Sequence, residues 1–559
     1  MQFLAKRRLT RGLLAAACTA GLWCIGLPAG AAPQQAPQGV QVPALSCDHD
    51  SALLVWQRPA TGDDVAFYNV YANGQLIGNT QDMNATLTGD KAKEFIGANQ
   101  ALVGDLLLRH SYEAKGLTAG TQYNFTVRAV GQDGKESADS QPVQVTTLAA
   151  PTVVKLTDFG GVGDGTTVNT AALQKAIDAT PAGGVLEIPA GTFVSGAVQL
   201  KSNMTLQLDK DAVLLESANP ADLTMGTNGR YIGMLNAKGV ENVRIVGEGV
   251  VDGNGWKTDA KGYYLKAKNK ENKGLRNEMH VLNIGIGAAQ QTQAQLDAGL
   301  EFKKAYNARS TTVIFQKGKN IYLEGVTFRN PAMHMLTMDC DNVVLNNVNV
   351  ETYNANNGDG IDYCGKGLLV VNSFFNTGDD AINFSAGMGK KAENEPPVSD
   401  IWIFNNVVEH GHGGIVLGSH TGSWIQNLLG EDNIFHHTDI SLRCKTGSGV
   451  GGGGRNVTFR HNVAQDMKKQ GFIFTTAYTD VNAVGSFIPG APGVFHDITV
   501  EDCVVDGTKK AAIEINGDAS AHHHDIHFKN VKFTNTHENI ENNCDNITYD
   551  GVTYQYAEK

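Results

Sequence analysis

One short pattern, a polar residue followed by alternating apolar residues, recurs along the chain from about residue 203 onward. The first copies read Asn203-Met-Thr-Leu and Asn242-Val-Arg-Ile, and later copies follow at intervals of roughly 21 to 41 residues. Alternation is typical of a strand that faces a core at every second position, and Asn or Asp at a turn tolerates left-handed backbone geometry. Because one coil cannot bury its own apolar face, the repeat predicts stacked coils, a β-solenoid. The polar residue of the clearest copies is Asn203, Asn242, Asn320, Asn342, Asp400, Asn456, Asp497, Asp525 or Asn546.

A solenoid needs a cap, because its first coil would otherwise expose the core. A Gly-rich turn at residues 158–165 is followed by an apolar-periodic stretch at residues 171–177, and together they predict a turn and an amphipathic helix. The glycines alone could indicate a nucleotide-binding loop, but no preceding strand and no ribose-binding acid accompany them. We therefore expect a capped solenoid domain over residues 150–559.

The preceding third of the chain predicts a separate β domain. Residues 33–43 are rich in Pro, Gln and Ala and indicate a linker, and residues 44–149 contain strand-like runs around Trp56 and an Asn-Gly hairpin turn. The spacing from Leu117 to Tyr123 resembles the tyrosine corner of a fibronectin type III sandwich. Residues 80–110 are longer and more helical than that module needs, so an insertion is expected. The domain is expected to space or dock its neighbour, with carbohydrate binding as a second reading.

The first 32 residues indicate a signal peptide. Lys6, Arg7, Arg8 and Arg11 form a basic region, an apolar stretch follows, and cleavage is expected near Ala31 or Ala32. The sequence therefore predicts export to the periplasm or the medium. No later apolar run reaches the length of a membrane span, so no membrane association is expected after cleavage.

Charge and cysteine content limit the partners. The formal charge is −12, and removal of the four cations of the signal peptide makes it −16 (−12 minus 4), which argues against a nucleic-acid partner. The cysteines outside the signal peptide show no tight CxxC spacing, so we expect mostly buried thiols, one disulfide at most, and no structural metal. We expect a monomer.

Four polar clusters between residues 354 and 446 carry the chemistry. A carboxylic acid can protonate a leaving oxygen while a carboxylate activates water, and Arg and Lys can hold a carboxylate of a substrate. Three acids, an imidazole and two cations therefore predict acid–base cleavage of an anionic polymer. The clusters are Asn357-Gly358-Asp359, Gly378-Asp379-Asp380, Gly411-His412-Gly413 and Arg443-Cys444-Lys445.

In this order and at these one-coil spacings, the clusters resemble the polygalacturonase (pectinase) family of glycoside hydrolases. The resemblance covers most of residues 151–559 and implies an all-β fold, a right-handed parallel β-helix, here preceded by the fibronectin type III-like sandwich. It implies hydrolysis of polygalacturonate or oligogalacturonides with inversion, without a cofactor. Asp379 would be the general acid, while Asp359 and Asp380 would position and deprotonate water.

The remaining site residues follow from position and resemblance. His412, between glycines, could tune or orient the acid. Arg443 and Lys445, two apart on a strand, face one side and suit a galacturonate carboxylate. Tyr478 is the candidate for the substrate-side Tyr of the family, with a Tyr of the core or of a side-chain ladder as an equal alternative, and Asn357 opens the first motif.

The sequence departs from the endo-acting relatives in ways that favour attack at chain ends. Many of those relatives carry a Lys near Ser385, whereas this chain has Ile382-Asn-Phe-Ser385. That form resembles bacterial exo-poly-α-galacturonosidases. The repeat is also interrupted at about residues 254–312, with Trp256, Tyr263, Tyr264, Arg276 and a helix predicted around residues 290–304; sugar stacking and a solvated surface excursion are equally compatible with this insertion.

Two histidine runs, His436-His437 and His522-His523-His524, could indicate a metal, but adjacent residues of a strand point in alternating directions, and we expect loop residues. Four functional alternatives stay open: an endo-polygalacturonase, a rhamnogalacturonan hydrolase, a β-helical pectate lyase that uses Ca²⁺, and a non-enzymatic adhesin.

Overall fold

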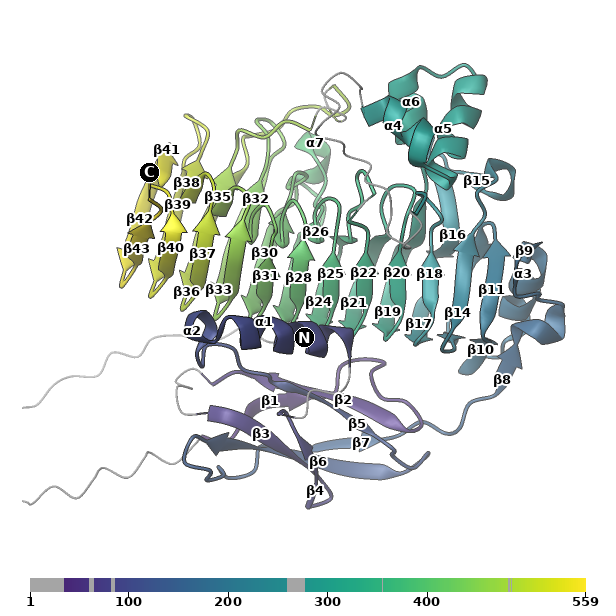
Figure 1. Ribbon diagram of the computed structural model, residues 1–559, viewed down its shortest axis with the longest axis horizontal. Coiled ribbons are helices and arrows are strands. Elements are labelled where there is room, and N and C mark those ends of the chain that lie inside the picture. Colours follow the sequence, from purple (N-terminus) through teal and green to yellow (C-terminus); the bar gives the residue numbers. More distant parts are fainter. Residues whose placement is uncertain are drawn as a thin grey trace, which may run out of the picture.

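The computed structural model describes residues 35–59, 65–81, 86–258, 277–353, 355–480, 483 and 485–558. The predicted signal peptide, residues 1–32, lies outside the described residues, as do Tyr263, Tyr264 and Arg276. A small β-sandwich lies alongside a long β-solenoid (Figure 1). The all-β prediction is confirmed. Within the described part of the chain, no helix combines the length and the apolar character that crossing a bilayer requires.

The sandwich consists of a three-stranded and a four-stranded antiparallel sheet. Tyr123 forms the predicted tyrosine corner, since its hydroxyl accepts a hydrogen bond from the backbone N–H of Thr118 at 2.9 Å. The linker predicted for residues 33–43 is wrong in part, because Gln38–Gln41 pair with the next strand and complete the first sheet. The strands are β1 (Gln38–Gln41), β2 (Ser51–Gln57) and β5 (Ser111–Lys115), then β4 (Gln75–Asn79), β3 (Val65–Ala72), β6 (Gln122–Gly131) and β7 (Val143–Thr146).

The solenoid is a parallel β-helix whose coils stack in register. One of its walls is a 13-stranded sheet that runs the length of the domain. In coil order it contains β9 (Asp164–Val168), β11 (Gly191–Ser195), β14 (Ala212–Glu216), β18 (Val250–Asp252), β20 (Thr327–Arg329), β22 (Asn349–Glu351), β25 (Phe374–Asn376), β28 (Val407–His410), β31 (Ile434–His436), β34 (Val463–Met467), β37 (Val504–Thr508), β40 (Lys532–Thr536) and β43 (Thr553–Tyr556).

A second, larger sheet forms the other walls. Most coils contribute two strands to it, so that β23 pairs with β26 while β24 pairs with β27. Its strands are β8 (Val153–Lys155), β10 (Gly184–Ile188), β12 (Val198–Gln199), β13 (Met204–Leu208), β15 (Thr224–Met225), β16 (Tyr231–Lys238), β17 (Glu241–Gly247), β19 (Thr311–Glu324), β21 (Leu336–Asn346), β23 (Ile361–Cys364), β24 (Lys366–Val371), β26 (Ile382–Phe384), β27 (Val398–Phe404), β29 (Ile415–Leu417), β30 (Ile425–Glu431), β32 (Leu442–Lys445), β33 (Gly453–Arg460), β35 (Gln470–Thr475), β36 (Val494–Glu501), β38 (Ala511–Asn516), β39 (His523–Lys529), β41 (Ile540–Asn542) and β42 (Cys544–Asp550).

The repeated Asn or Asp has the conformation that the sequence predicts. All nine of these residues have a positive φ, from 50° at Asn546 to 60° at Asp400. Their side chains also bond along the ridge of the solenoid: the Asn320 amide donates to Asn242 Oδ1 at 2.9 Å, and that of Asn242 donates to Asn203 Oδ1 at 2.8 Å. The polar position of the repeat therefore supplies both the turn and a contact between coils.

The predicted cap is present. A short 3-10 helix (Leu156–Phe159) follows β8, and α3 (Thr170–Ala179) covers the first coil. Leu173, Ala176 and Ile177 of α3 are fully buried and belong to the same hydrophobic cluster as the core of the solenoid. The cap thus continues the core.

The described part of the insertion, residues 254–258 and 277–312, includes helices that lie above the solenoid (Figure 1). They are α4 (Asn277–Ile284), α5 (Gly287–Asp297) and α6 (Phe302–Asn307). The single helix predicted around residues 290–304 is wrong, because the chain breaks at Gly299, whose φ is 90°. Trp256 does not face a sugar site: it is 1% exposed and its Nε1 donates to the Pro331 carbonyl at 3.1 Å.

The sandwich packs against the solenoid through one face of β2, while the other face belongs to the core of the sandwich. Ala52, Leu54 and Trp56 belong to the core of the sandwich, whereas Leu53 and Val55 pack against solenoid residues that include Leu369. The predicted helical insertion, α1 (Leu87–Ala98) and α2 (Gln100–Val103), lies on the 13-stranded sheet.

The six described cysteines are free thiols: Cys47, Cys340, Cys364, Cys444, Cys503 and Cys544.

Candidate active site

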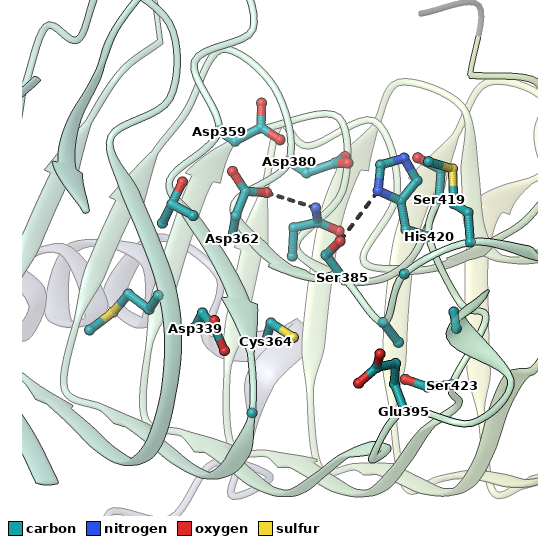
Figure 2. Close-up of a pocket in the computed structure, with 18 of the residues that line it drawn as sticks. Asp339, Asp359, Asp362, Cys364, Asp380, Ser385, Glu395, Ser419, His420 and Ser423 are labelled. Atoms are coloured by element: carbon teal, nitrogen blue, oxygen red, sulfur yellow. Dashed lines mark hydrogen bonds between the residues drawn. The ribbon is translucent and has the colours of Figure 1, made fainter. Parts of the chain in front are cut away.

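A groove of about 1490 Å³ opens at the side of the large sheet, and the acidic motifs line it. Figure 2 shows Asp359, Asp362 and Asp380 projecting from neighbouring coils into this groove, with Ser385 and His420 further along. The coils adjoin in the order that the motifs have in the sequence: the Asp379 N–H donates to the Gly358 carbonyl at 3.3 Å, and the His412 N–H donates to the Asp379 carbonyl at 2.9 Å. The predicted stacking of the motifs is confirmed.

Asp379 and His412 form a direct pair. His412 Nδ1 lies 2.7 Å from Asp379 Oδ1, and both side chains are partly exposed, 34% for His412 and 19% for Asp379. A short contact between an imidazole and a carboxyl group is a hydrogen bond, and it fixes the orientation of both side chains. This geometry suits a group that must deliver a proton to an oxygen of a bound substrate.

Asp380 is held by both predicted cations. Arg443 Nη1 donates to Asp380 Oδ1 at 2.8 Å and Lys445 Nζ donates to Asp380 Oδ2 at 2.6 Å. Burial alone would lower the pKa of Lys445, but the Asp380 carboxylate outweighs it and raises the pKa. The two cations therefore hold the Asp380 carboxylate, whereas the sequence predicted them only to bind a carboxylate of the substrate.

Tyr478 joins the same cluster. The Lys445 ammonium lies 4.8 Å from the centroid of its ring, and the Arg443 guanidinium lies 5.9 Å from it. Such cation–π contacts fix the ring at the edge of the groove, which Tyr478 and Lys445 both line. The structure brings this predicted residue to the site.

A half-buried ion cluster around Asp359 was missed by sequence reasoning. His334 Nδ1 lies 3.4 Å from Asp359 Oδ1 and 2.9 Å from Asp362 Oδ2, and the Asn383 amide donates to Asp362 Oδ1 at 2.9 Å. Burial alone would lower the pKa of His334, but the charges of Asp359 and Asp362 raise it to about 10. Burial raises the pKa of Asp359, and His334 opposes that rise. His334 is thus a cation at neutral pH, between two acids.

Strand register is the signal that could have found His334. Leu336 pairs with Ile361 in the parallel β21–β23 ladder, so the residue two positions before each, His334 and Asp359, stands side by side on neighbouring coils. Aligning the coils on their apolar positions would place this imidazole beside the first acidic motif.

Asn357 is fixed from outside the groove. Its Oδ1 accepts a hydrogen bond from Arg309 Nη2 at 3.0 Å, and Arg309 is fully buried, with further bonds to the carbonyls of Tyr306, Ala332 and Asn356. Tyr306 belongs to helix α6, so the inserted helices support the first motif. After His334, Arg309 is a second residue of the site that no sequence motif predicted.

Loops close the groove beyond the acids. Lys391 and Glu395 lie on one segment of the lining and Phe487 and Ile488 on another, and the two segments meet where the Lys390 N–H donates to the Ile488 carbonyl at 3.0 Å. The first segment contains the short helix α7 (Gly389–Ala392). Ser385 occupies the wall, 3.3 Å from His420 Nδ1. The groove is therefore walled at the end away from Asp359.

Two groups of the described residues have ligand atoms close enough to hold a metal ion. In the first, His334 with Asp359 and Asp362, the imidazolium itself supplies the cation, and a protonated ring has no lone pair to offer. The second is Glu409 with His436 and His437. Here the prediction that the two histidines point in alternating directions is wrong, because both Nδ1 atoms face Glu409. At His522-His523-His524 the alternation is confirmed, since only His523 is buried. The expectation that both runs lie in loops is wrong, because His436 ends β31 and His523 and His524 begin β39.

Comparison with known proteins agrees with this geometry. Residues 180–554 match the model of glycosyl hydrolases family 28, and residues 35–146 match the fibronectin type III domain. The chain is 39% identical to an exo-poly-alpha-D-galacturonosidase of Dickeya chrysanthemi over 563 residues, which cover 94% of this chain and 92% of that protein.

Solved structures give the same result. A family 28 exopolygalacturonase of Yersinia enterocolitica superposes with a TM-score of 0.88 at 37% identity, covering 94% of this chain and 97% of that one. An exopolygalacturonase of Thermotoga maritima shares the fold, with a TM-score of 0.56 at 23% identity over 71% of this chain and 91% of that one. The chain therefore belongs to glycosyl hydrolases family 28.

Proposed function

We propose that the protein hydrolyses α-1,4-galacturonosidic bonds of polygalacturonate from the non-reducing end and releases short galacturonides. The observation that carries this function is the groove itself. It combines three carboxyl groups of two adjoining coils with the buried Lys445, and Arg443 pairs with Asp380 beside it, in a chain similar over nearly its whole length to an exo-poly-alpha-D-galacturonosidase.

The roles of the residues follow the chemistry of an inverting hydrolase. Asp379, in contact with His412, protonates the oxygen of the leaving sugar. Asp359 and Asp380 hold the water that attacks the opposite face of the ring. The galacturonate carboxylate binds next to these acids, where it contacts Arg443, Lys445 and Tyr478. No step of this scheme requires a cofactor.

The walls of the groove support attack at chain ends. A polymer that is to be cut internally must run through the groove, whereas the segments that carry Lys391 and Ile488 stand across one end. A terminal sugar fits against such a wall, and the bond that is cut then lies at a fixed distance from the chain end.

A time course on de-esterified polygalacturonate tests the function. Reducing ends, viscosity and the absorbance of unsaturated products are followed together, with and without a chelator. We expect reducing ends to rise while viscosity falls little, without absorbance and without an effect of the chelator. Asp379→Asn should abolish turnover and keep the fold.

Each other outcome rejects part of the proposal. A fast fall in viscosity would mean an endo-acting hydrolase. Absorbance that the chelator abolishes would mean a lyase and would overturn the acid–base roles. Turnover of rhamnogalacturonan but not polygalacturonate would change the substrate, and binding without any turnover would favour an adhesin.

We further propose that the protein is exported and acts as a monomer in the periplasm or the medium, free of the membrane. The basic and apolar segments of residues 1–32 support export. Mass spectrometry of the secreted protein should find a new N-terminus near Ala31 or Ala32. Light scattering during gel filtration should give the mass of one chain, and twice that mass would reject the monomer.

A further inference from the structure

A second cluster of ionisable side chains lies on the outer face of the 13-stranded sheet, outside the groove. Its members, Glu409, His436 and His437, come from strands β28 and β31, which pair through Val407–Ile434 and Val408–Phe435. Val408 and Phe435 belong to the core of the solenoid, whereas Val407 and Ile434 pack outward against α1. Glu409 and His436, two positions further along, therefore also project outward, side by side.

His437 joins them because of its backbone conformation. In a regular strand it would point away from His436, but its φ is 57°, in the left-handed region that residues other than glycine rarely adopt. The turn places the two imidazole rings in a stack, with centroids 3.6 Å apart and planes inclined by 28°. Two adjacent residues thus present their rings to one carboxylate.

The donor atoms have the spacing of metal ligands. Nδ1 of His436 lies 3.3 Å from Glu409 Oε2, and Nδ1 of His437 lies 3.2 Å from Glu409 Oε1. Hydrogen bonds of this type cluster nearer to about 2.9–3.0 Å. Two ligands at about 2.0–2.1 Å from a tetrahedral Zn²⁺ are separated by about 3.3 Å. The two contacts are long hydrogen bonds in this structure, and their separations are also those of two ligands of one ion.

A further carboxylate lies behind the rings. Asp466 Oδ2, from strand β34, is 3.6 Å from Nε2 of His437 and 3.9 Å from Nε2 of His436. Histidines that bind a metal through one ring nitrogen generally direct the other toward a carboxylate, which fixes the tautomer. Both rings therefore have an acid on each side, Glu409 at Nδ1 and Asp466 at Nε2.

We propose that Glu409, His436 and His437 bind one divalent transition-metal ion, Zn²⁺ in the first instance, with Asp466 orienting the imidazoles. Two imidazoles and a carboxylate suit Zn²⁺ rather than Ca²⁺ or Mg²⁺, which take oxygen ligands. The side chains are 22%, 38% and 24% exposed for His436, His437 and Glu409, so water completes the coordination. The ion joins two coils next to the loop of His412, and the proposal does not depend on the hydrolytic function.

The test is a titration of metal-free full-length protein with Zn²⁺ and with Co²⁺. Calorimetry should find one tight Zn²⁺ site per chain, Co²⁺ should give the visible absorption of a four- or five-coordinate ion, and Zn²⁺ should raise the Tm. H436A/H437A should weaken binding at least a hundredfold. H496A/H524A is the matched control: these rings also stack, 4.8 Å apart, but each Nδ1 contacts its own neighbouring aspartate at 2.7 Å.

The outcomes are distinct. Loss of the tight site in H436A/H437A and its retention in H496A/H524A support the proposal. Absence of a tight site in the wild type, its survival in H436A/H437A, or equal loss in both double variants overturns it. If H436A/H437A does not fold, Glu409→Gln decides, since it keeps the shape of the side chain and should weaken Zn²⁺ binding at least tenfold.

Discussion

His334 carries a positive charge that influences the pKa of Asp359 in the groove. It lies within 3.4 Å of Asp359 and 2.9 Å of Asp362, and those carboxylates raise its pKa to about 10. His334→Gln keeps a polar group but removes the charge, so the pKa of Asp359, already raised by burial, should rise further. We expect kcat/KM to fall by roughly 10- to 100-fold, the range for a lost hydrogen bond to a charged group. The rate-against-pH profile should also shift to higher pH.

The pH profile on oligogalacturonides separates this role from a structural one. His523→Gln is the control, because it also replaces a buried imidazole, one that contacts Thr476 and Phe495 rather than an acid. It should lower stability and leave the profile in place. A His334→Gln enzyme with the profile of the wild type would show that Asp359 titrates independently of His334.

At this scale the sequence is informative only where residues fall in motifs. Asp359, Asp379, Asp380 and His412 could be named because their neighbours in the sequence mark them. His334 and Arg309 stand alone in the sequence and reach the site only through the register of coils and an inserted helix. Which acid has the raised pKa depends on burial, and no spacing of residues reports burial.

The Asn ridge determines how neighbouring coils stack, and Asn427 tests it. Its φ is 57°, its amide donates to Asp400 Oδ1 at 3.0 Å, and its Oδ1 accepts from the Asn456 amide at 2.7 Å. Asn427→Gly loses the hydrogen bonds, at about 0.5–1.5 kcal/mol each, and a smaller amount, about 0.4–1 kcal/mol, through the greater freedom of the unfolded chain. Asn427→Ala also places a Cβ in the left-handed region, at a further ~1–2 kcal/mol. Thermal unfolding should therefore rank the wild type above Gly and Gly above Ala; Ala equal to or above Gly would contradict the account.

The inserted helices are tied to the solenoid by a buried acid whose effect on stability depends on pH. Glu216 is fully buried and accepts hydrogen bonds from Ser310 Oγ at 2.6 Å and from Gln291 of α5 at 3.4 Å. Burial raises its pKa from 4.5 to about 7. The folded state therefore holds this proton more tightly than the unfolded state. The stabilisation is complete below pH 4.5 and is lost as pH rises to 7, at most about 3 kcal/mol.

Glu216→Gln should remove this dependence. The difference in Tm between the wild type and the variant should shift in favour of the variant as pH rises from 4.5 to 7, and then stay constant. Glu538→Gln, at an exposed position, should show no such shift. A constant difference for Glu216→Gln across the range would mean that Glu216 is ionised in the folded protein.

Strands and helices could be predicted from the sequence where their apolar residues recur with a clear period. The strands of the solenoid and the helix of the cap have clear periods and appear where expected. The insertion has none: Trp256 was compatible with a sugar site and proves to be buried, because the helices above it supply an apolar cluster of their own. The short strand at residues 38–41 lies in a Pro- and Gln-rich stretch, and only pairing with β2 makes it a strand.

On the scale of the whole molecule, β2 is shared between two cores. Its alternate residues Leu54 and Trp56 face the sandwich, while Leu53 and Val55 face the solenoid. L53S/V55S should therefore undock the sandwich without disturbing its own core. Two exposed polar residues in place of buried apolar ones remove roughly 3–6 kcal/mol of burial, and neighbouring contacts such as Leu108 N–H to Asp432 Oδ1 at 2.7 Å would be lost with them.

Calorimetry and small-angle scattering measure the result. The wild type should unfold in one transition, because each domain covers the apolar interface of the other and their unfolding is therefore coupled. L53S/V55S should show two transitions and a larger radius of gyration. Tyr123→Phe, which removes the hydroxyl of the tyrosine corner, is the control for weakening the sandwich while it stays docked; it should lower the transition temperature and leave the radius unchanged. If L53S/V55S keeps one transition and the radius of the wild type, the polar contacts alone hold the two domains together. Since Leu53 and Val55 are 1% and 0% exposed, we expect the apolar contact to dominate, and the sandwich then stabilises the part of the large sheet on which it packs.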